Sequence, residues 1–251
     1  MSLSRRKLIT TGLSAAAGAT GLAAADRLVR RYGLIPPDSG TVYGPGETLT
    51  YAAQRLIASH TLAREFPRSM ISAAPFANET SPFTDTFKRQ QSRNFADWQL
   101  TVEGAVAHPT SFSVSDLRTL GRRSQITEIA CEEGWSYVAE WIGTPLSAVL
   151  REAGVLPQAR YVAYFSDQPD WWDSLDIQEA LHPQTVIAWG MNDSDLPVGF
   201  GGPLRMRVAR QLGYKNIKFI TRIVATDSLK HFGKGLGSAS PEAGYAWYAG
   251  I

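Results

Sequence analysis

Cysteine is nearly absent from this chain: Cys131 is the only one in 251 residues, so no disulfide can form within it. The sequence also lacks a Cys-x-x-Cys-His motif, a set of cysteines for an iron–sulfur cluster and a Gly-x-Gly-x-x-Gly turn. These absences exclude covalently attached haem, a cysteine-ligated cluster and the usual turn that binds a flavin or nicotinamide dinucleotide. The four histidines show no metal-binding spacing; we interpret them as structural and leave His231 open, because it is close to the C-terminal residues.

Long apolar runs are also missing, since no stretch provides the 20 or so strongly apolar residues that a spanning helix requires. The apolar stretch that ends at Leu22 is short and rich in glycine, and it follows Ser4-Arg5-Arg6-Lys7. Ala23-Ala24-Ala25 comes next and is typical of a cleavage site. Residues 1–25 therefore resemble a twin-arginine export signal and predict a periplasmic protein. An uncleaved membrane anchor and the basic start of a cytosolic protein remain as alternatives.

Acidic and basic residues are balanced once that segment is set aside. The whole chain has a net charge of +2, but Arg5, Arg6 and Lys7 fall within residues 1–25, which contain no acid. Without them, 22 basic and 23 acidic residues remain, a net charge of −1. No basic run longer than two residues is left, so nothing indicates nucleic-acid binding.

The pattern of short apolar segments predicts an α+β fold with mixed sheets. Residues 26–93 contain several proline and glycine pairs and predict an irregular segment that wraps the core, with one helix over 49–65. Further along, a helix is expected with Ser115 as its N-cap and another over 146–153, ended by Gly154. Strands are expected at 99–104, 125–131, 161–165, 185–189, 204–208 and 219–225.

Four blocks of sequence carry a resemblance to a known family. They are Cys131-Glu132-Glu133-Gly134-Trp135-Ser136, Trp141-Ile142-Gly143-Thr144-Pro145-Leu146, Leu196-Pro197 with Gly202-Pro203-Leu204-Arg205, and Gly213-Tyr214-Lys215-Asn216-Ile217-Lys218. In this order they resemble the molybdopterin domain of the sulfite oxidase family, over roughly residues 94–251. The chain is most similar to the bacterial periplasmic branch that includes methionine sulfoxide reductase catalytic subunits. That branch lacks a C-terminal dimerisation domain, which implies a monomer.

The resemblance implies that Cys131 is the protein ligand of a molybdenum atom held by one molybdopterin. Soft thiolate sulfur suits such a metal, although most unpaired cysteines are small buried hydrophobic residues, and this alternative stays open. Glu133 would point to the same side as Cys131 on an extended backbone. It matches an acid that handles protons near the metal in the bacterial branch, unless it is a surface acid. Glu132 is expected to point away.

The resemblance also implies the residues that hold the pterin and its phosphate. Arg205 follows two glycines, and its guanidinium can grip a phosphate in two places, with a surface salt bridge as the alternative. The other implied cofactor contacts are weaker, because asparagine and serine are common in turns and lysine is common on surfaces. They are Asn94, Asp97, Trp98, Ser166, Asn216, Ile217 and Lys218.

Some positions depart from the family pattern. Phe200 stands where relatives carry histidine or asparagine, which predicts a lost or relocated polar contact. Acids follow Cys131 where sulfite oxidases have arginine, so an anionic substrate such as sulfite would be repelled. The aromatic clusters at Trp171-Trp172 and around Tyr248 are expected to pack in the core, with a role in the wall above the metal as the alternative.

The sequence therefore predicts an exported molybdenum oxidoreductase that transfers an oxygen atom, in the direction that reduces an S-oxide, an N-oxide or methionine sulfoxide. Electrons must come from another protein, either a membrane haem protein or a soluble cytochrome, because the chain has no motif for a second redox group. One alternative is a sulfite dehydrogenase that passes electrons to a cytochrome. The other is a binding module for a pterin or another small ligand that has lost catalysis, as Phe200 would indicate.

Overall fold

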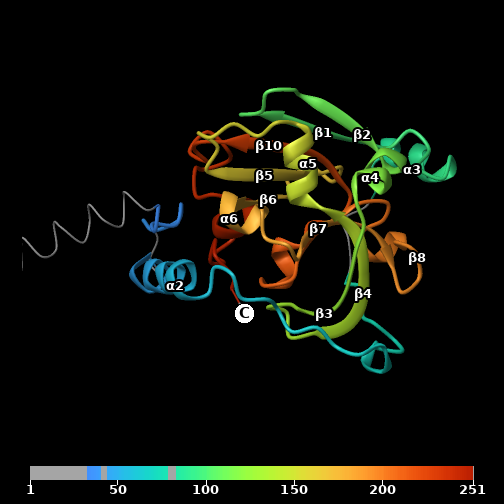
Figure 1. Cartoon of the computed structure of the whole chain (residues 1–251), viewed down its shortest axis with the longest axis horizontal. Coiled ribbons are helices and arrows are strands. Elements are labelled where there is room, and N and C mark those ends of the chain that lie inside the picture. The colour runs from blue at the N-terminus through green and yellow to red at the C-terminus, as the bar shows by residue number, and fades with distance from the viewer. Residues whose placement is uncertain (1–32, 41–43, 79–82, 251) are drawn as a thin grey trace, which may run out of the picture.

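The computed structural model describes residues 33–40, 44–78 and 83–250, and two β-sheets form the centre of this part of the chain (Figure 1). The expected signal over 1–25 lies outside the described residues. Within them, no helix combines the length and the apolar character needed to cross a membrane.

The first sheet has the strand order β2-β1-β10-β5-β6. β1 and β10 run parallel although they are far apart in sequence, and the other pairs are antiparallel. Its strands are β1 (Gln99–Gly104), β2 (Thr110–Ser113), β5 (Tyr161–Ser166), β6 (Trp172–Asp176) and β10 (Ile220–Thr226).

The second sheet is antiparallel, with the order β3-β4-β7-β8 and with β9 also paired to β7. β3 carries the site cysteine just beyond its end, and β4 is the long strand that pairs with it throughout. The strands are β3 (Arg123–Ala130), β4 (Ser136–Pro145), β7 (Thr185–Met191), β8 (Ser194–Asp195) and β9 (Arg205–Val208).

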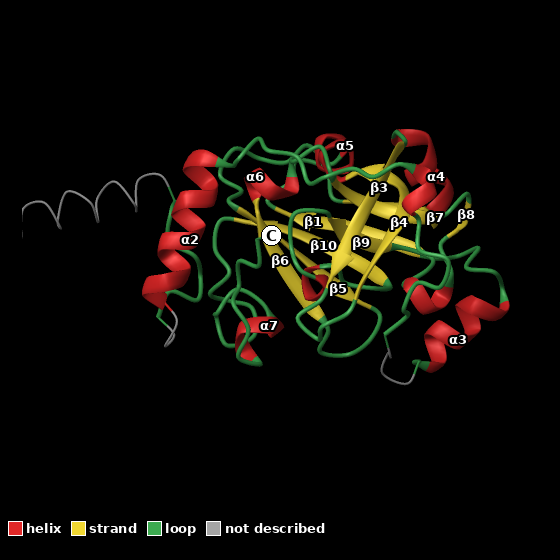
Figure 2. Cartoon of the chain, turned by 90° about the horizontal axis from the view of Figure 1, so that it is seen from below, coloured by secondary structure: helices red, strands yellow, loops and turns green. Residues whose placement is uncertain are grey.

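Helices are short and lie around the sheets, as Figure 2 shows. α2 lies at one end of the molecule and α3 at the opposite end. The helices are α2 (Gly44–Ile57), α3 (Asp85–Ser92), α4 (Val114–Leu120), α5 (Leu146–Glu152), α6 (Ile177–Ala180) and α7 (Ala239–Glu242), with 3-10 turns η1 (Arg68–Met70), η2 (Val198–Phe200) and η3 (Gly213–Lys215).

The α+β class with mixed sheets is confirmed, but two helix boundaries differ from the expectation. The helix expected over 49–65 is α2, which begins at Gly44 and ends at Ile57. The cap of α4 is Ser113 rather than Ser115, because the Ser113 hydroxyl accepts from the Asp116 N–H while the Asp116 carboxylate accepts from the Ser113 N–H. This reciprocal capping box uses residues three apart and so fixes the start of the helix.

One apolar core joins the two sheets. Buried residues from β1, β5 and β10 pack with Ile187 of β7 and Met206 of β9, and with α4 and α5 above them. The segment before β1 contacts both sheets: the Phe66 N–H donates to the carbonyl of Ile126 in β3, and Phe87 packs against Phe219 beside β10. The sheets therefore hold a fixed relative position, on which a site built between them depends.

Candidate active site

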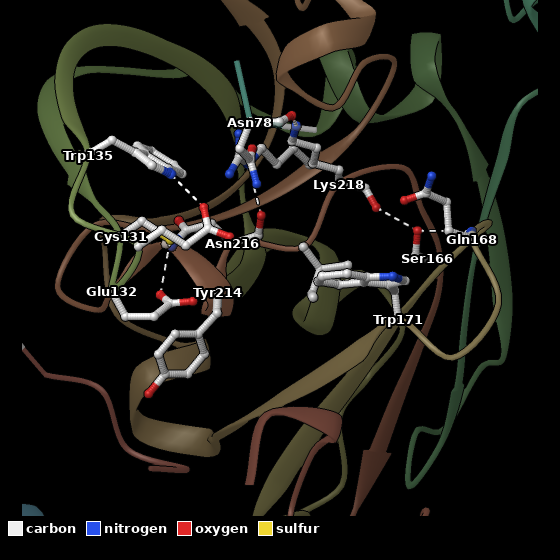
Figure 3. Close-up of a pocket in the computed structure, with 14 residues that line it drawn as sticks. Asn78, Cys131, Glu132, Trp135, Ser166, Gln168, Trp171, Tyr214, Asn216 and Lys218 are labelled. Atoms are coloured by element: carbon white, nitrogen blue, oxygen red, sulfur yellow. Dashed lines mark hydrogen bonds between the residues drawn. The ribbon is translucent and has the colours of Figure 1, made fainter. Parts of the chain in front are cut away.

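Cys131 lies directly after β3, in a tight turn that returns the chain to β4. The Cys131 N–H donates to the carbonyl of Trp135 at 2.9 Å, and the Gly134 N–H donates to the carbonyl of Cys131 at 3.1 Å. Gly134 has φ of +90°, a conformation that side chains disfavour and glycine adopts easily. The turn places the thiol, which is half-buried, on the wall of an open pocket (Figure 3).

Both acids of this turn line the pocket, which corrects the expectation that Glu132 points away. The Cys131 thiol donates to Glu132 Oε2 at 3.0 Å, whereas Glu133 Oε2 accepts from the indole N–H of Trp135 at 2.6 Å. Alternation of side chains applies to an extended strand, and β3 has already ended at Ala130. The turn therefore brings two carboxylates, not one, to the pocket, and the thiol contacts that of Glu132.

The thiol is held in its protonated form by its surroundings in the metal-free chain. Burial, followed by the hydrogen bond to Glu132, raises the pKa of Cys131 to about 12. The backbone of Gly213 lies against it, since a Cβ at that position would come within 2.9 Å of the Cys131 sulfur. Only glycine allows this approach, so the Gly213 turn and the cysteine turn form one continuous wall.

The opposite wall comes from the first sheet and from the residues that follow η3. Ser166, the last residue of β5, donates its hydroxyl proton to the carbonyl of Lys218 at 2.9 Å. The Asn216 side chain accepts from the Val208 N–H and from Arg207, and donates to the carbonyl of Leu212. Of the residues that the resemblance implies as cofactor contacts, Ser166, Asn216, Ile217 and Lys218 line the pocket.

Two buried arginines stand behind this wall without a carboxylate partner among the described residues. Arg205 Nε donates to the carbonyl of Asn216 and its Nη1 to the carbonyl of Phe200. Arg207 bridges the Asn216 side chain to Thr127 of β3. Burial lowers the pKa of Arg205, and burial together with the neighbouring Arg205 lowers the pKa of Arg207 to about 9. Arg205 is thus not a surface salt bridge, and buried positive charge without compensation favours an anion.

Lys218 adds a third cation at the pocket. Its ammonium donates to the carbonyls of Asn78 and Gly199, at 3.0 and 2.8 Å. Burial, and then the charge of Arg205, lower the pKa of Lys218 to about 7. A bound anion would raise the pKa of Lys218 again, because its negative charge would stabilise the ammonium more than the surrounding carbonyl oxygens do.

Three predicted cofactor residues do not line this pocket. Asn94 and Asp97 are exposed, and Asp97 pairs with Arg93 at 2.5 Å. Trp98 is buried in the core, where its indole N–H donates to the carbonyl of Ile220 at 3.1 Å. Tyr248 is also buried, against Tyr51 of α2. Tyr248 therefore packs in the core, as expected. Trp98 is also a core residue and does not reach the pocket.

Phe200 acts at the site through its backbone. Its carbonyl accepts from Arg205, while its ring packs edge-on against Tyr137 at 5.8 Å, outside the pocket lining. Because the Phe200 side chain packs in the core of the second sheet, phenylalanine at this position leaves the hydrogen bond from Arg205 to its carbonyl in place.

Several pocket residues were not predicted. Trp171 is 52% exposed at the pocket while its neighbour Trp172 is buried, so one member of the pair faces the site and the other the core. The blocks that carry the resemblance could have identified four others, since Glu132 and Trp135 belong to one block and Gly213 and Tyr214 to another. Trp171 thus takes the alternative role in the wall, and the unpredicted lining residues are Asn78, Glu132, Trp135, Gln168, Gly213 and Tyr214.

Comparison with known proteins decides the family. Residues 87–231 match the model of the oxidoreductase molybdopterin binding domain. The chain belongs to the sulfite oxidase family of molybdopterin oxidoreductases. It is 32% identical over 197 residues to a protein of Azospira oryzae whose name provisionally describes a protein-methionine-sulfoxide reductase subunit, YedZ1; the match covers 78% of this chain and 70% of that one.

A second relative agrees on the family, and a solved structure agrees on the fold. The protein-methionine-sulfoxide reductase catalytic subunit MsrP of Xanthomonas axonopodis is 30% identical over 236 residues, covering 87% of this chain and 68% of that protein. The solved structure of the sulfane dehydrogenase SoxCD of Paracoccus pantotrophus superposes with a TM-score of 0.52 at 20% identity, and shares the fold alone. It covers 68% of this chain and 46% of that one, so this chain matches less than half of it.

The residues of the pocket fit a molybdopterin. The thiol of Cys131 supplies a soft ligand at the wall, Arg205 and Lys218 supply uncompensated positive charge for a phosphate, and Gly213 leaves room for a close approach. No group of three or more histidine, cysteine, aspartate or glutamate side chains among the described residues could hold a metal ion by itself. A metal at Cys131 would therefore take its remaining ligands from the cofactor.

Proposed function

We propose that this oxidoreductase is an exported molybdenum enzyme that reduces an S-oxide or N-oxide, including methionine sulfoxide. The observation that carries the proposal is the Cys131 thiol, hydrogen-bonded to Glu132 and with Glu133 lining the same pocket, together with Arg205 and Lys218, cations of that pocket without acidic partners among the described residues. The relatives named for methionine sulfoxide reduction support the substrate class.

Each side chain of the pocket has a role in this proposal. Molybdopterin, when bound, supplies the metal at which an oxygen atom and two electrons are exchanged. Cys131 is the protein ligand, and Arg205 and Lys218 hold the phosphate end. Glu133 handles the protons, with its carboxylate kept in place by the indole N–H of Trp135. Ser166 and Asn216 fix the turn between these two ends.

The overall reaction requires electrons and protons from outside the chain. Reduction of a sulfoxide consumes two electrons and two protons and yields a thioether and water. A membrane haem protein or a soluble cytochrome is proposed as the electron partner. Periplasmic location through a signal at 1–25, a wrapping segment at 26–93, a catalytic domain at 94–251 and a monomeric state belong to the same proposal.

A sulfite dehydrogenase is the second candidate, supported only by the family. The carboxylates of Glu132 and Glu133 at the thiol oppose it, because sulfite is an anion and would approach two like charges. Steady-state assays with sulfite and with methionine sulfoxide distinguish the two functions. We expect methionine sulfoxide to be turned over with the larger kcat/KM.

Metal analysis tests the proposal. The protein, expressed with an intact cofactor pathway, is expected to contain one molybdenum per chain and to show a Mo(V) electron paramagnetic resonance signal. Cys131→Ser should abolish activity while the pterin is still found by fluorescence of its oxidised form. Protein without molybdenum would refute the proposal, and a Cys131→Ser variant with full activity would refute the role of the thiol. Pterin bound without any turnover of either substrate would instead identify a binding module.

A further inference from the structure

The lining of the active-site pocket changes in character with depth. Arg205, Asn216 and Ile217 are buried, whereas Glu132 and Trp171 are exposed although they line the same pocket. The buried part therefore offers positive charge and an amide, and the exposed part offers a carboxylate and an indole ring. The buried part suits the phosphate and pterin of the proposed cofactor, so the substrate would contact the exposed part.

The charge of the exposed part is negative. Glu132 and Glu133 are both exposed at the pocket. Among the described residues, the cations that line the pocket are Arg205 and Lys218, and the proposed cofactor phosphate would be held by both. These cations would then no longer offset the two acids. Carboxylates without compensation attract a cation and repel an anion.

Trp171 adds an aromatic face to the exposed part. Its neighbour Trp172 stacks on Phe165, whereas the indole of Trp171 is 52% exposed and contacts no aromatic ring among the described residues. Figure 3 shows this indole on the opposite side of the pocket from Cys131. Asp170, the residue before it, is exposed as well. The face of an indole attracts a cation more strongly than any other aromatic side chain does.

Two more aromatic side chains are fixed at the pocket. The Trp135 indole N–H donates to Glu133 Oε2 at 2.6 Å, and the Tyr214 hydroxyl donates to the carbonyl of Ala246 at 2.6 Å. Because these polar atoms already have partners, the two side chains offer their rings to a ligand. Rings alone would favour any apolar substrate. Rings together with carboxylates favour an ammonium or guanidinium group.

We propose that the pocket selects substrates that carry a positive charge beside the oxide, and that Glu132 and Trp171 determine this preference. The inference rests on the proposed function and narrows its substrate class to cationic oxides, such as methionine sulfoxide next to lysine in a peptide. The cationic group would contact the exposed part of the pocket while the oxide approaches Cys131.

Three blocked peptides test the proposal. Each contains one methionine sulfoxide flanked on both sides by lysine, by glutamine or by glutamate, and all are assayed with one artificial donor at a fixed concentration. The molybdenum-loaded protein should reduce the lysine peptide with a kcat/KM about tenfold above that of the glutamine peptide and about 100-fold above that of the glutamate peptide. The difference should lie mainly in KM, and it should shrink at an ionic strength of about 0.3 M, where exposed charges are screened.

Two variants separate these residues from the overall charge of the protein. Glu132→Gln and Trp171→Leu should each lower the preference for lysine over glutamine from about tenfold to about threefold. The ratio is taken within one preparation, so a change in cofactor content or in kcat does not affect it. Glu152→Gln is the matched control, because Glu152 is exposed on α5 outside the pocket and its replacement changes the net charge equally. The ratio should be unchanged in this variant.

Each outcome decides the question. Equal kcat/KM for the three peptides would overturn the inference and leave the proposed function in place, and so would a preference that persists in full in both variants. Turnover of none of the peptides would refute the proposed function instead. Isothermal titration of the lysine and glutamine peptides in their thioether form into the same protein then decides the inference. The lysine peptide should bind about tenfold more tightly, and equal binding would overturn the inference.

Discussion

Replacing Lys218 by methionine should stabilise the metal-free protein at low pH and destabilise it at high pH. The ammonium is buried near Arg205, and its pKa is lowered from 10.5 to about 7. A lysine whose folded pKa is depressed contributes full stability above its unfolded pKa, and this contribution is lost as the pH falls from about 10.5 to 7. Below pH 7 the folded protein carries the whole penalty, which Lys218→Met removes.

The size of the effect follows from the same pKa. One pKa unit corresponds to about 1.4 kcal/mol, so the penalty is at most roughly 5 kcal/mol, and rearrangement around the charge reduces it to about 2–3 kcal/mol. The variant also loses two hydrogen bonds, to the carbonyls of Asn78 and Gly199, at about 1 kcal/mol each. The free energy of unfolding should therefore rise by about 1 kcal/mol at pH 6 and fall by about 1–2 kcal/mol at pH 10.

Urea unfolding of the cofactor-free protein at the two pH values measures this change of sign. The same substitution should weaken retention of molybdopterin at least about tenfold, because the phosphate loses a cation. Lys234→Met, at an exposed position, is the control. If Lys218→Met lowers stability equally at both pH values, the ammonium is not a penalty in the metal-free pocket, and the assignment of the pocket to an anion loses its main support.

Three other substitutions test the rest of the site. Gly213→Ala should lower molybdenum content at least tenfold without unfolding the chain, because its Cβ would stand 2.9 Å from the Cys131 sulfur. Glu133→Gln should lower kcat by about 10²-fold with molybdenum content unchanged, since it removes the proposed proton carrier. Lys215→Met should lower the free energy of unfolding by about 3–5 kcal/mol in thermal or urea melts, because it leaves the Asp173 carboxylate buried without its cation.

Each of these three predictions has a control and an outcome that contradicts it. Gly199→Ala places its Cβ at an ordinary 3.5 Å from Ala77, so a similar loss of metal there would remove the argument from close approach. A larger fall in kcat for Glu132→Gln than for Glu133→Gln would show that Glu132, and not Glu133, handles the protons. A Lys215→Met protein as stable as the parent would show that the buried pair is neutral for stability.

The strands were predictable where one face is buried and the other exposed. β1 alternates in this way, and the sequence places it at its observed bounds. β4 and β6 were not predicted, because nearly every residue in them is buried and no alternation remains. The acids of β6 would have argued against burial, yet Asp173 and Asp176 are paired with Lys215 and Arg55 from distant parts of the chain. Such pairing is invisible to local sequence patterns.

The site was predictable where sequence blocks reach it, and not where backbone direction decides. Cys131, Arg205 and Lys218 follow from the blocks, and all three line the pocket. The direction of Glu132 does not, because it depends on where β3 ends and the turn begins. Sequence blocks around a site therefore predict which residues line it, but they do not predict the direction in which each side chain points.

The pocket is assembled from both sheets, and this has a consequence for biosynthesis. Cys131 follows β3 of one sheet, Ser166 ends β5 of the other, and the η3 turn closes against the cysteine from more than 80 residues further along. A chain that has formed only one sheet has no cofactor site at all. Since a ligand that binds only the native state stabilises that state, cofactor capture acts as a checkpoint that retains completely folded molecules. If the pocket takes molybdopterin as proposed, cofactor should be retained only by chains in which both sheets have docked.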